Sequence, residues 1–314
     1  MQSGHDHQEP SIWAVVVTYH PDLAVLEEML ESLCDQVAAT IVVDNSEDRN
    51  VAAWLDHRGR NDRLELLAQG RNAGLGAAQN RGIARARESG ASHVLLLDQD
   101  SVPSGGMVRR LFSALSALES RGERIAAVGP RYVDSRSRRP SYFVAAGGFG
   151  RRRLRCSQAS SGDVVKTEFL ISSGALIPMP TLDAVGAMDE SLFVDHVDSE
   201  WFLRAAARGY RAFGVCDAEM THHLGTGRRR VWFGVWHELA CYEPSRYYYI
   251  FRNSVLLFRR RYVPLRWMAA EVFRLGALFF LHALAREERW RRMSMMLRGL
   301  RDGWRGRLGS IDAN

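Results

Sequence analysis

The first 130 residues alternate between short apolar runs and longer amphipathic stretches, and this alternation constrains the fold more than any other feature. The runs are rich in β-branched residues and have the length of buried strands, whereas the stretches between them repeat apolar residues at helical spacing. Strands that alternate with helices form a mostly parallel sheet covered by helices on both faces, so we predict an α/β fold. The expected strands span 11–19, 40–46, 64–69, 93–100 and 125–130, and the expected helices span 22–34, 74–90 and 104–120.

Polar side chains follow three of these strands where each strand ends, in the segments TYHP, DNS and DQDS. In open parallel sheets, ligands bind at the carboxyl ends of the strands. We therefore expect these segments to supply functional groups to one edge of the sheet. A dinucleotide site at GLGAAQ is disfavoured, because its third glycine is missing and the segment follows the third strand instead of the first.

Asp98 and Asp100 stand at the tip of the fourth expected strand, and three interpretations suit them. Carboxylate oxygens bind Mg²⁺ or Mn²⁺, and such an ion can hold a departing diphosphate. An aspartyl-phosphate phosphatase also uses two aspartates, but it needs them on the first strand with a lysine nearby. Here the only lysine, Lys166, lies in a polar segment. The third interpretation is structural, as caps of the helix expected near Ser104.

The middle of the chain has a different composition. Residues 131–163 are rich in Arg, Ser and Gly and have weak periodicity, which indicates an insertion or loop with short strands. A helix at 198–210, ended by Gly209, and a short strand at 211–216 follow. From about Val231 onward the pattern predicts helices throughout. No uninterrupted apolar segment reaches the ~18 residues that a membrane-spanning helix needs.

Residues 1–11 are polar and lack the apolar core of a signal peptide, so we expect a disordered tail there. The cysteines are scattered and form no CxxC pair, so neither a zinc site nor a disulfide framework is indicated. We expect small buried residues in a reducing cytosol at all of these positions. The cysteines are Cys34, Cys156, Cys216 and Cys241.

Positive charge is concentrated at the C-terminal end. From Thr226 onward there are 18 arginines against 7 acidic residues, although the whole chain has a net charge of +6. A basic helix with aromatic residues suits an anionic membrane surface, and the apolar segment LGALFFLHAL is too short to span a bilayer. Nucleic acid is disfavoured as a partner because the expected helices have large apolar faces and no nucleic-acid motif is present. A helical cap or a dimer interface is the alternative.

Eight segments, in their order along the chain, resemble the family-two inverting glycosyltransferases of GT-A fold, and more narrowly the bacterial rhamnosyltransferases. The resemblance extends from Ile12 to about Arg261, and LLLDQDS and FVDHVDSEW are its most specific parts. The closing LRGLRDGWRGRLG is similar to rhamnosyltransferases that make rhamnolipid surfactant. The eight segments are VVVTYHPD, VVDNS, GRNAGLGAAQNRGI, LLLDQDS, FLISSGALIP, MDESLFVDHVDSEWFLRAAARGY, HHLGT and YYYIFRNSVLLFRR.

This resemblance implies a domain organisation. A Rossmann-like GT-A catalytic domain would span 12–230, with the nucleotide-binding half at 12–102 and the acceptor half at 103–230. A basic amphipathic helical region would follow at 231–314.

The resemblance also implies a donor site with a divalent cation, Mg²⁺ or Mn²⁺. Asp100 would be the direct metal ligand, and Asp98 would contact the ribose or the metal. His222 would complete the metal site, with His223 as the alternate. The other donor-site residues would be Thr18, Tyr19 and Asp44 at the nucleotide, Asn72, Gly74 and Asn80 at the ribose and diphosphate, and Arg252 with Arg246 at the diphosphate. A loose helix start is the structural alternative for the glycines near position 74.

Asp198 occupies the position of the family's catalytic aspartate, with Glu200 and Asp195 as further candidates. Such a base removes the proton of the acceptor hydroxyl while that oxygen attacks the anomeric carbon from the face opposite the diphosphate. The result is inversion in one step. Carboxylates that favour a helix N-terminus are the structural alternative.

The activity implied is transfer of L-rhamnose from TDP-L-rhamnose to a hydroxyl of a lipid-linked glycan or rhamnolipid acceptor. A family-two transferase that uses another nucleotide sugar is one alternative. A non-catalytic nucleotide-sugar-binding or scaffold protein is the alternative from a different class. With its basic C-terminal region, the chain is expected to be cytoplasmic and peripheral on the inner face of the cytoplasmic membrane.

Overall fold

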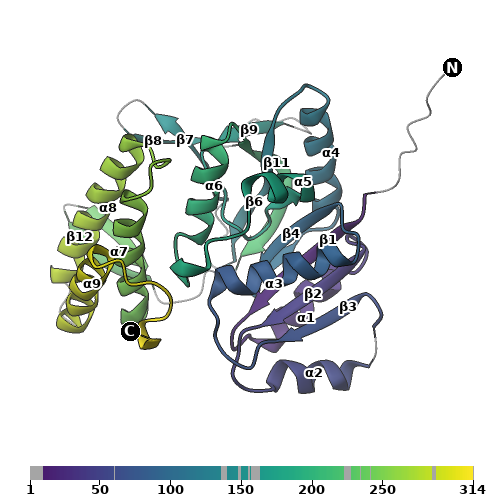
Figure 1. Cartoon of the computed structure of the whole chain (residues 1–314), viewed down its shortest axis with the longest axis horizontal. Coiled ribbons are helices and arrows are strands. Elements are labelled where there is room, and N and C mark those ends of the chain that lie inside the picture. The colour runs from purple at the N-terminus through teal and green to yellow at the C-terminus, as the bar shows by residue number, and fades with distance from the viewer. Residues whose placement is uncertain are drawn as a thin grey trace.

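The computed structural model describes residues 10–59, 61–135, 140–147, 150–154, 156, 163–222, 228–233, 235–240, 242–284 and 288–313. A central sheet with helices packed against it occupies one side of the molecule, and a group of helices from the C-terminal part of the chain lies beside it (Figure 1). The sheet positions most of the predicted site residues, and the C-terminal helices complete the site.

Nine strands form the central sheet, in the order β3-β2-β1-β4-β10-β6-β11-β5, with β9 paired to β11. β3, β2, β1 and β4 are parallel, as predicted, whereas β10 runs antiparallel to both β4 and β6. The strands are β1 (Ile12–Thr18), β2 (Ala39–Asp44), β3 (Leu64–Ala68), β4 (His93–Asp98), β5 (Ser101–Pro103), β6 (Ile125–Asp134), β9 (Val164–Thr167), β10 (Leu176–Pro178) and β11 (Arg211–His222).

Helices cover both faces of the sheet, which confirms the predicted α/β architecture. Val15 and Val17 of β1 pack with α3 and α6 on one face, while Ala14 and Val16 pack with α1 and α4 on the other. Burial on both faces explains why the sequence of β1 is almost continuously apolar. The helices are α1 (Leu23–Leu33), α2 (Asn50–Arg58), α3 (Leu75–Glu88), α4 (Met107–Glu119), α5 (Met179–Val185) and α6 (Val197–Ala207).

Local signals place several helix ends where the sequence predicted them. Asp22 caps α1 by accepting a hydrogen bond from the Ala24 N–H at 3.0 Å. Gly209 follows α6 with φ +83°, a conformation that glycine adopts without strain. The sequence analysis missed α2 and α5. Both helices are short. Val51 is the buried residue of α2, so the sequence of α2 shows little helical periodicity of apolar residues.

The predicted insertion at 131–163 contains a hairpin of short strands, β7 (Phe143–Gly147) and β8 (Gly150–Leu154). The prediction of helices throughout the region after Val231 is wrong at its start. There β12 (Arg228–Phe233) and β13 (Val235–Ala240) pair as an antiparallel hairpin. The β-branched and aromatic residues of VWFGVW favour strands, and this signal was overlooked.

Three helices complete the chain, namely α7 (Pro244–Phe258), α8 (Leu265–Leu284) and α9 (Arg289–Trp304). α9 packs closely on α7, because a Cβ at Gly299 would lie 2.4 Å from the Tyr248 carbonyl oxygen, and one at Gly303 would lie 2.7 Å from that of Arg252. Glycine therefore permits this close approach of the two helices. α9 is thus part of the folded body and not a detached tail.

α8 corrects a second prediction about this region. It is 20 residues long, its most apolar window has a mean hydropathy of 1.4, and 22% of that window is buried. By length and composition it meets the requirement for a membrane span, although the sequence analysis considered only the segment LGALFFLHAL. Length and composition alone do not establish a spanning topology.

Cysteine usage also differs from the prediction. Cys156 and Cys216 form a disulfide with their Cα atoms 5.6 Å apart. Cys34 is unpaired but exposed, and Cys241 lies outside the described residues. The pair was not visible in the sequence because 60 positions separate the two residues. Pairing of β9 with β11 brings the second half of the insertion to Cys216, whose N–H donates to the Asp163 carbonyl.

Candidate active site

Asp98, Asp100 and His222 come together at the carboxyl end of β4. Asp98 ends β4, Asp100 lies in the next turn, and His222 ends β11 opposite Ser101 of β5. One ligand atom from each of the three side chains lies within 4.8 Å of the others, and His222 Nδ1 is 3.4 Å from an Asp100 oxygen. Carboxylates with one imidazole suit Mn²⁺ or Mg²⁺, so these residues fit the predicted cation. The alternate ligand, His223, lies outside the described residues.

The structural interpretation of the two aspartates as helix caps does not hold. α4 begins at Met107, its preceding residue is Gly106, and no side chain caps it by a hydrogen bond. Asp98 and Asp100 instead face His222 across the turn between β4 and β5.

Two buried serines support His222 and the end of β4. Ser101 Oγ lies 2.7 Å from His222 Nδ1, and Ser173 Oγ donates to Ser101 Oγ at 2.7 Å. Ser173 Oγ also accepts the Asp98 N–H at 3.0 Å. Hydrogen bonds of this kind fix the orientation of a metal-binding imidazole. The sequence analysis gave neither serine a role, although both lie in segments that carry the family resemblance.

Negative charge is concentrated in this cluster. The pKa of Asp98 is raised to about 7, first by burial and then by repulsion from Asp100 and Asp198, while the Arg246 guanidinium opposes the rise. A divalent cation would favour the charged form of these carboxylates and remove the penalty. The electrostatics of the site therefore agree with its ligand geometry.

Asp44, at the end of β2, lies beside the end of β1. Its Oδ1 accepts hydrogen bonds from Thr18 Oγ1 at 2.9 Å and from Ser46 Oγ at 2.7 Å, and all three side chains are buried. Tyr19 directly follows β1. Its side chain is 44% exposed, and its backbone N–H donates to Gln99 Oε1 at 2.6 Å. Parallel pairing of β1 with β2 thus brings the predicted nucleotide-site residues together.

Asn72, Gly74 and Asn80 shape the loop that precedes α6. The Asn72 side-chain oxygen accepts the Gly74 N–H at 3.0 Å. Gly74 has φ +90°, and a Cβ there would lie 2.7 Å from the Phe193 carbonyl oxygen, so only glycine fits. The Asn80 amide donates to the Met188 carbonyl at 3.0 Å and accepts the Met188 N–H at 2.9 Å. These contacts are with the protein itself, and a role of the three residues at the ribose or diphosphate stays a prediction.

Asp198 lies in the first turn of α6, close enough to Asp98 for their charges to repel. Burial raises the pKa of Asp198, the Ser199 N–H at 2.6 Å from its Oδ1 and the His196 ring lower it, and Asp195 adds to the rise. Its hydrogen bonds within the described residues are with Ser199, and both use Oδ1. A half-buried carboxylate with a raised pKa beside candidate metal ligands has the properties of a general base.

The other two candidate bases are held in ion pairs. Glu200 is buried and accepts hydrogen bonds from Arg204 Nε at 2.8 Å and Nη2 at 2.9 Å, and from the Tyr262 hydroxyl. The Asp195 carboxylate accepts from Arg246 Nε at 3.1 Å. These partners occupy the carboxylates, which favours Asp198 among the three.

Arg252 is placed differently from the prediction. Its side chain is fully buried and donates to the backbone carbonyls of Leu192, at 2.8 Å, and of Gly309. We therefore assign Arg252 to the support of the chain before α6. Arg246, one of the two arginines considered, is partly exposed and lies near Asp98, and its role at the diphosphate stays a prediction.

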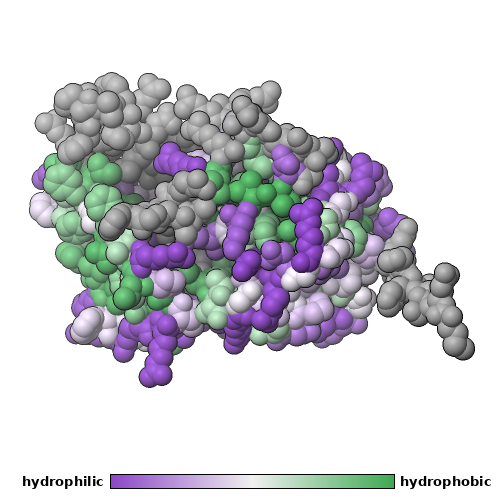
Figure 2. Space-filling view, turned by 90° about the horizontal axis from the view of Figure 1, so that it is seen from above, coloured by the Kyte–Doolittle hydropathy of each residue, from purple (hydrophilic) through white to green (hydrophobic). Residues whose placement is uncertain are grey.

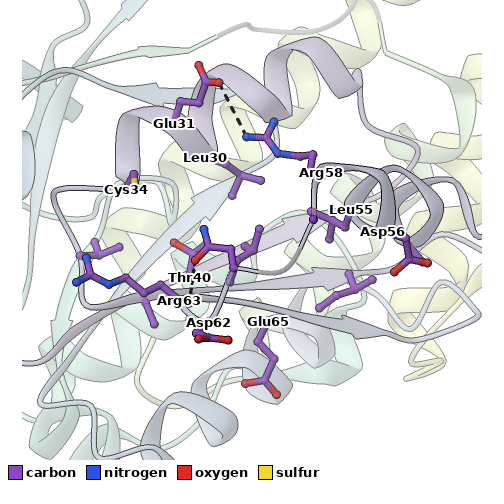
Figure 3. A pocket seen from close by; sticks show the side chains of 17 residues that line it. Leu30, Glu31, Cys34, Thr40, Leu55, Asp56, Arg58, Asp62, Arg63 and Glu65 are labelled. Atoms are coloured by element: carbon purple, nitrogen blue, oxygen red, sulfur yellow. Dashed lines mark hydrogen bonds and ion pairs between the residues drawn. The ribbon is translucent and has the colours of Figure 1, made fainter.

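A pocket of about 780 Å³ lies away from this cluster, between α1, α2 and the amino ends of β2 and β3 (Figure 3). Arg58 and Glu31 form an ion pair at its rim. No predicted site residue is among the described residues that line it. The chemistry of the Asp98 cluster is therefore at the opposite edge of the sheet from this pocket.

A comparison with known families agrees with the fold. The model of the family described as Glycosyl transferase family 2 matches residues 13–177, which is more than half of the chain. The chain belongs to this family. It is a glycosyltransferase, as the resemblance predicted.

Two relatives are similar in sequence to this glycosyltransferase over most of its length. The dTDP-rhamnosyl transferase RfbF of Shigella flexneri is 31% identical over 264 residues, which cover 83% of this chain and 84% of RfbF. The galactofuranosyltransferase GlfT1 of Mycolicibacterium smegmatis is 28% identical over 271 residues, which cover 82% of this chain and 87% of GlfT1.

Solved structures confirm the GT-A-like fold. GalNAc-T7 with UDP, GalNAc and Mn²⁺ matches with a TM-score of 0.57 and 13% identity, covering 68% of this chain and 43% of that chain. S. aureus TarS 1-349 matches with a TM-score of 0.53 and 14% identity, covering 94% of this chain and 92% of that chain. At such identities the likeness concerns the fold alone.

Proposed function

We propose that this glycosyltransferase transfers L-rhamnose from TDP-L-rhamnose to a hydroxyl of a lipid-linked glycan or rhamnolipid-type acceptor, with inversion at the anomeric carbon. The observation that carries the proposal is the position of Asp198 beside the cluster of Asp98, Asp100 and His222. A candidate base and a candidate diphosphate-neutralising site thus share one edge of the sheet. The name of the relative RfbF specifies dTDP-rhamnose, which supports the donor.

The reaction is a single displacement. Asp198 accepts the proton of the acceptor hydroxyl while that oxygen forms a bond to the anomeric carbon. The bond from the anomeric carbon to the diphosphate breaks on the opposite face, and its electron pair leaves with TDP. Arg246 stabilises the negative charge of the departing diphosphate. Asp98, Asp100 and His222 would hold a divalent cation, which would supply further charge neutralisation there.

A panel of nucleotide sugars tests the donor. We expect TDP-L-rhamnose to give the highest kcat/KM, and the product linkage, determined by NMR, to have the anomeric configuration opposite to that of the donor. The relative GlfT1 favours a second candidate, transfer of galactofuranose, so that donor belongs in the panel. A higher kcat/KM for another sugar would replace rhamnose in the proposal, and a retained configuration would contradict the single displacement.

The acceptor proposal rests on the outer surface of the C-terminal helices. Large apolar side chains of α8 and α9 are exposed, among them Phe273 at 80% and Trp304 at 81%. Hydrophobic surface is prominent at the end of the molecule formed by these helices (Figure 2). Together with the 18 arginines from Thr226 onward, these side chains suit insertion at an anionic membrane surface. We therefore propose a peripheral location on the cytoplasmic face of the cytoplasmic membrane, where a lipid-linked acceptor is presented.

Sedimentation with vesicles tests this location. We expect the full chain to bind vesicles that contain anionic lipid, because each arginine near such a surface contributes ~1 kcal/mol. Binding should weaken as salt is raised, since the screening length falls from ~10 Å at 0.1 M to ~3 Å at 1 M. Substitution of both Phe273 and Phe280 by Ser should reduce the vesicle binding that remains at high salt. Equal binding to neutral vesicles would contradict the contribution of the arginines, and equal binding by the double variant would remove α8 from the membrane contact.

A further inference from the structure

The loop that leads into α6 has an unusual backbone. Phe193, Asp195 and His196 all have positive φ, at 66°, 60° and 62°, although none of them is glycine. Such conformations are unfavourable for residues other than glycine and persist where the surroundings hold them in place. His196 directly precedes α6, so the conformation of this loop determines where the first turn of the helix places Asp198.

One side of the loop is held by α7. The two N–H groups of the Asn253 side-chain amide are shared among three carbonyls of the loop, those of Leu192 at 3.0 Å, Val194 at 2.8 Å and Asp195 at 2.8 Å. Arg252 adds a bond to the Leu192 carbonyl. These bonds fix the backbone up to Asp195 but do not involve the His196 ring.

The His196 ring is held by a buried carboxylate of α8. His196 Nε2 lies 3.2 Å from Glu271 Oε1 and 3.0 Å from Ser254 Oγ, and Ser254 Oγ donates to the same Glu271 oxygen at 2.8 Å. Arg274 Nε donates to the other Glu271 oxygen at 2.8 Å. Glu271 and Ser254 are both fully buried, and Trp267 packs against the ring edge-on at 6.0 Å.

This arrangement gives the imidazole a definite role. Glu271 can only accept, so a proton on His196 Nε2 lets the ring donate to Glu271 Oε1, while Arg274 Nη2 lies 3.5 Å from the same ring nitrogen. A buried carboxylate is expensive unless it is paired, and Glu271 is paired from both sides by Arg274 and His196. The contacts of His196 with Glu271 and Ser254 therefore fix the position of its ring.

We infer that Glu271 and His196 form a positioning pair through which α8 holds Asp198 in place for deprotonation of the acceptor. The inference rests on the proposed role of Asp198. It assigns to α8 a function in the reaction that is separate from its exposed apolar face. His196 and Glu271 do not touch the reacting atoms, and they act through the start of α6.

Glu271→Gln tests this pair, with kcat, the donor KM and donor affinity by calorimetry measured together. We expect kcat to fall by up to about 100-fold, since a displacement of ~1 Å at a reacting group can cost that much. Donor affinity should stay within about twofold of the wild-type value, because the pair does not contact the predicted donor site. Ser254→Ala is a milder second variant that removes only the bridging hydroxyl, and it should lower kcat in the same direction by a smaller factor.

Asp302→Asn is the matched control. Asp302 is also a fully buried carboxylate of the C-terminal helices, where its ion pairs are with Arg298, Arg301 and Arg307 and not with His196. At a temperature where it is folded, this variant should keep kcat near the wild-type value. An equal loss of kcat in Asp302→Asn would show that the effect is general damage to the helices and would overturn the inference.

A double variant separates positioning from structural damage. When Asp198 is already Asn, Glu271→Gln should lower the residual rate no further, because there is no base left to position. A full multiplicative loss in that background, or an unchanged kcat in a folded Glu271→Gln or Ser254→Ala protein, would contradict the pair. If the wild-type chain transfers no rhamnose, the proposed donor fails, and the same comparison with the donor identified by the panel decides the role of the pair.

Discussion

Replacing Asp198 with Asn is expected to lower kcat by about 10²- to 10⁴-fold, which is the contribution of a general base. The amide has nearly the same shape but cannot take the acceptor proton. Donor binding should persist, because Asp198 is the candidate base and not one of the predicted donor-site residues. The measurement is steady-state transfer to the acceptor, together with the donor dissociation constant by calorimetry. Loss of turnover with retained binding would also exclude the non-catalytic scaffold.

Glu200→Gln is the control that separates chemistry from folding. Glu200 is paired with Arg204 inside the protein, so removing its charge should cost about 3–5 kcal/mol of stability. At a temperature where the variant is folded, its kcat should stay close to that of the wild type. If Glu200→Gln lost kcat without loss of stability while Asp198→Asn did not, the base would have to be assigned to Glu200.

The pH profile gives an independent check on Asp198. Burial raises the pKa of this carboxyl in the folded protein, and only the ionised form can accept a proton. The rate should therefore fall as pH decreases through that raised pKa, and the acid limb should lie at a higher pH than an ordinary aspartate would give. At saturating Mn²⁺, so that protonation of Asp98 does not limit the rate, the limb should disappear in Asp198→Asn. Its survival in that variant would transfer the base to Asp195 or Glu200.

The sheet was predictable from the sequence because its first strands are buried on both faces. Strands such as β1 and β4 are continuous apolar runs, and the helices between them carry strong periodicity. β10 was not recognised, because a strand of three residues in the apolar segment FLISSGALIP has no periodicity of its own. It runs antiparallel between β4 and β6, and only the tertiary fold shows this.

The candidate site was predictable where function follows from residue type, and not where it follows from packing. Two aspartates at the end of a strand suggest a metal site, alongside a phosphatase site or helix caps. Ser173 and Asn253 do not, because each becomes informative only when sheet pairing or α7 brings it to its partner. Arg252 shows the opposite failure. Its place in the family segment YYYIFRNSVLLFRR suggested a contact with the diphosphate. On α7, however, its side chain points into the protein interior.

Asp100→Asn is expected to lower kcat by at least about 100-fold and to weaken Mn²⁺ binding, because charge neutralisation by a divalent cation contributes several kcal/mol and each 1.36 kcal/mol is tenfold. Removal of the cation from the wild-type protein with a chelator should have a similar effect, and adding Mn²⁺ or Mg²⁺ back should restore the rate. Calorimetric titration with Mn²⁺, in the presence and absence of TDP, measures the binding. Glu219→Gln is the control, since Glu219 lies on the same strand as His222 but pairs with Arg131.

The binding of Mn²⁺ should also depend on pH in a direction that the structure fixes. The pKa of Asp98 is raised to about 7, so in the absence of a cation this carboxyl is partly protonated at neutral pH. A proton and a cation then compete for the same oxygens. Affinity for Mn²⁺ should therefore decrease as pH falls through about 7 and level off above it, and binding should release a proton near neutrality. Asp98→Asn should weaken binding and abolish this pH dependence around 7.

Transfer that continues unchanged in chelator, with Asp100→Asn equal to the wild type, would mean that the cluster serves the donor without a metal. Arg246 alone would then neutralise the departing diphosphate.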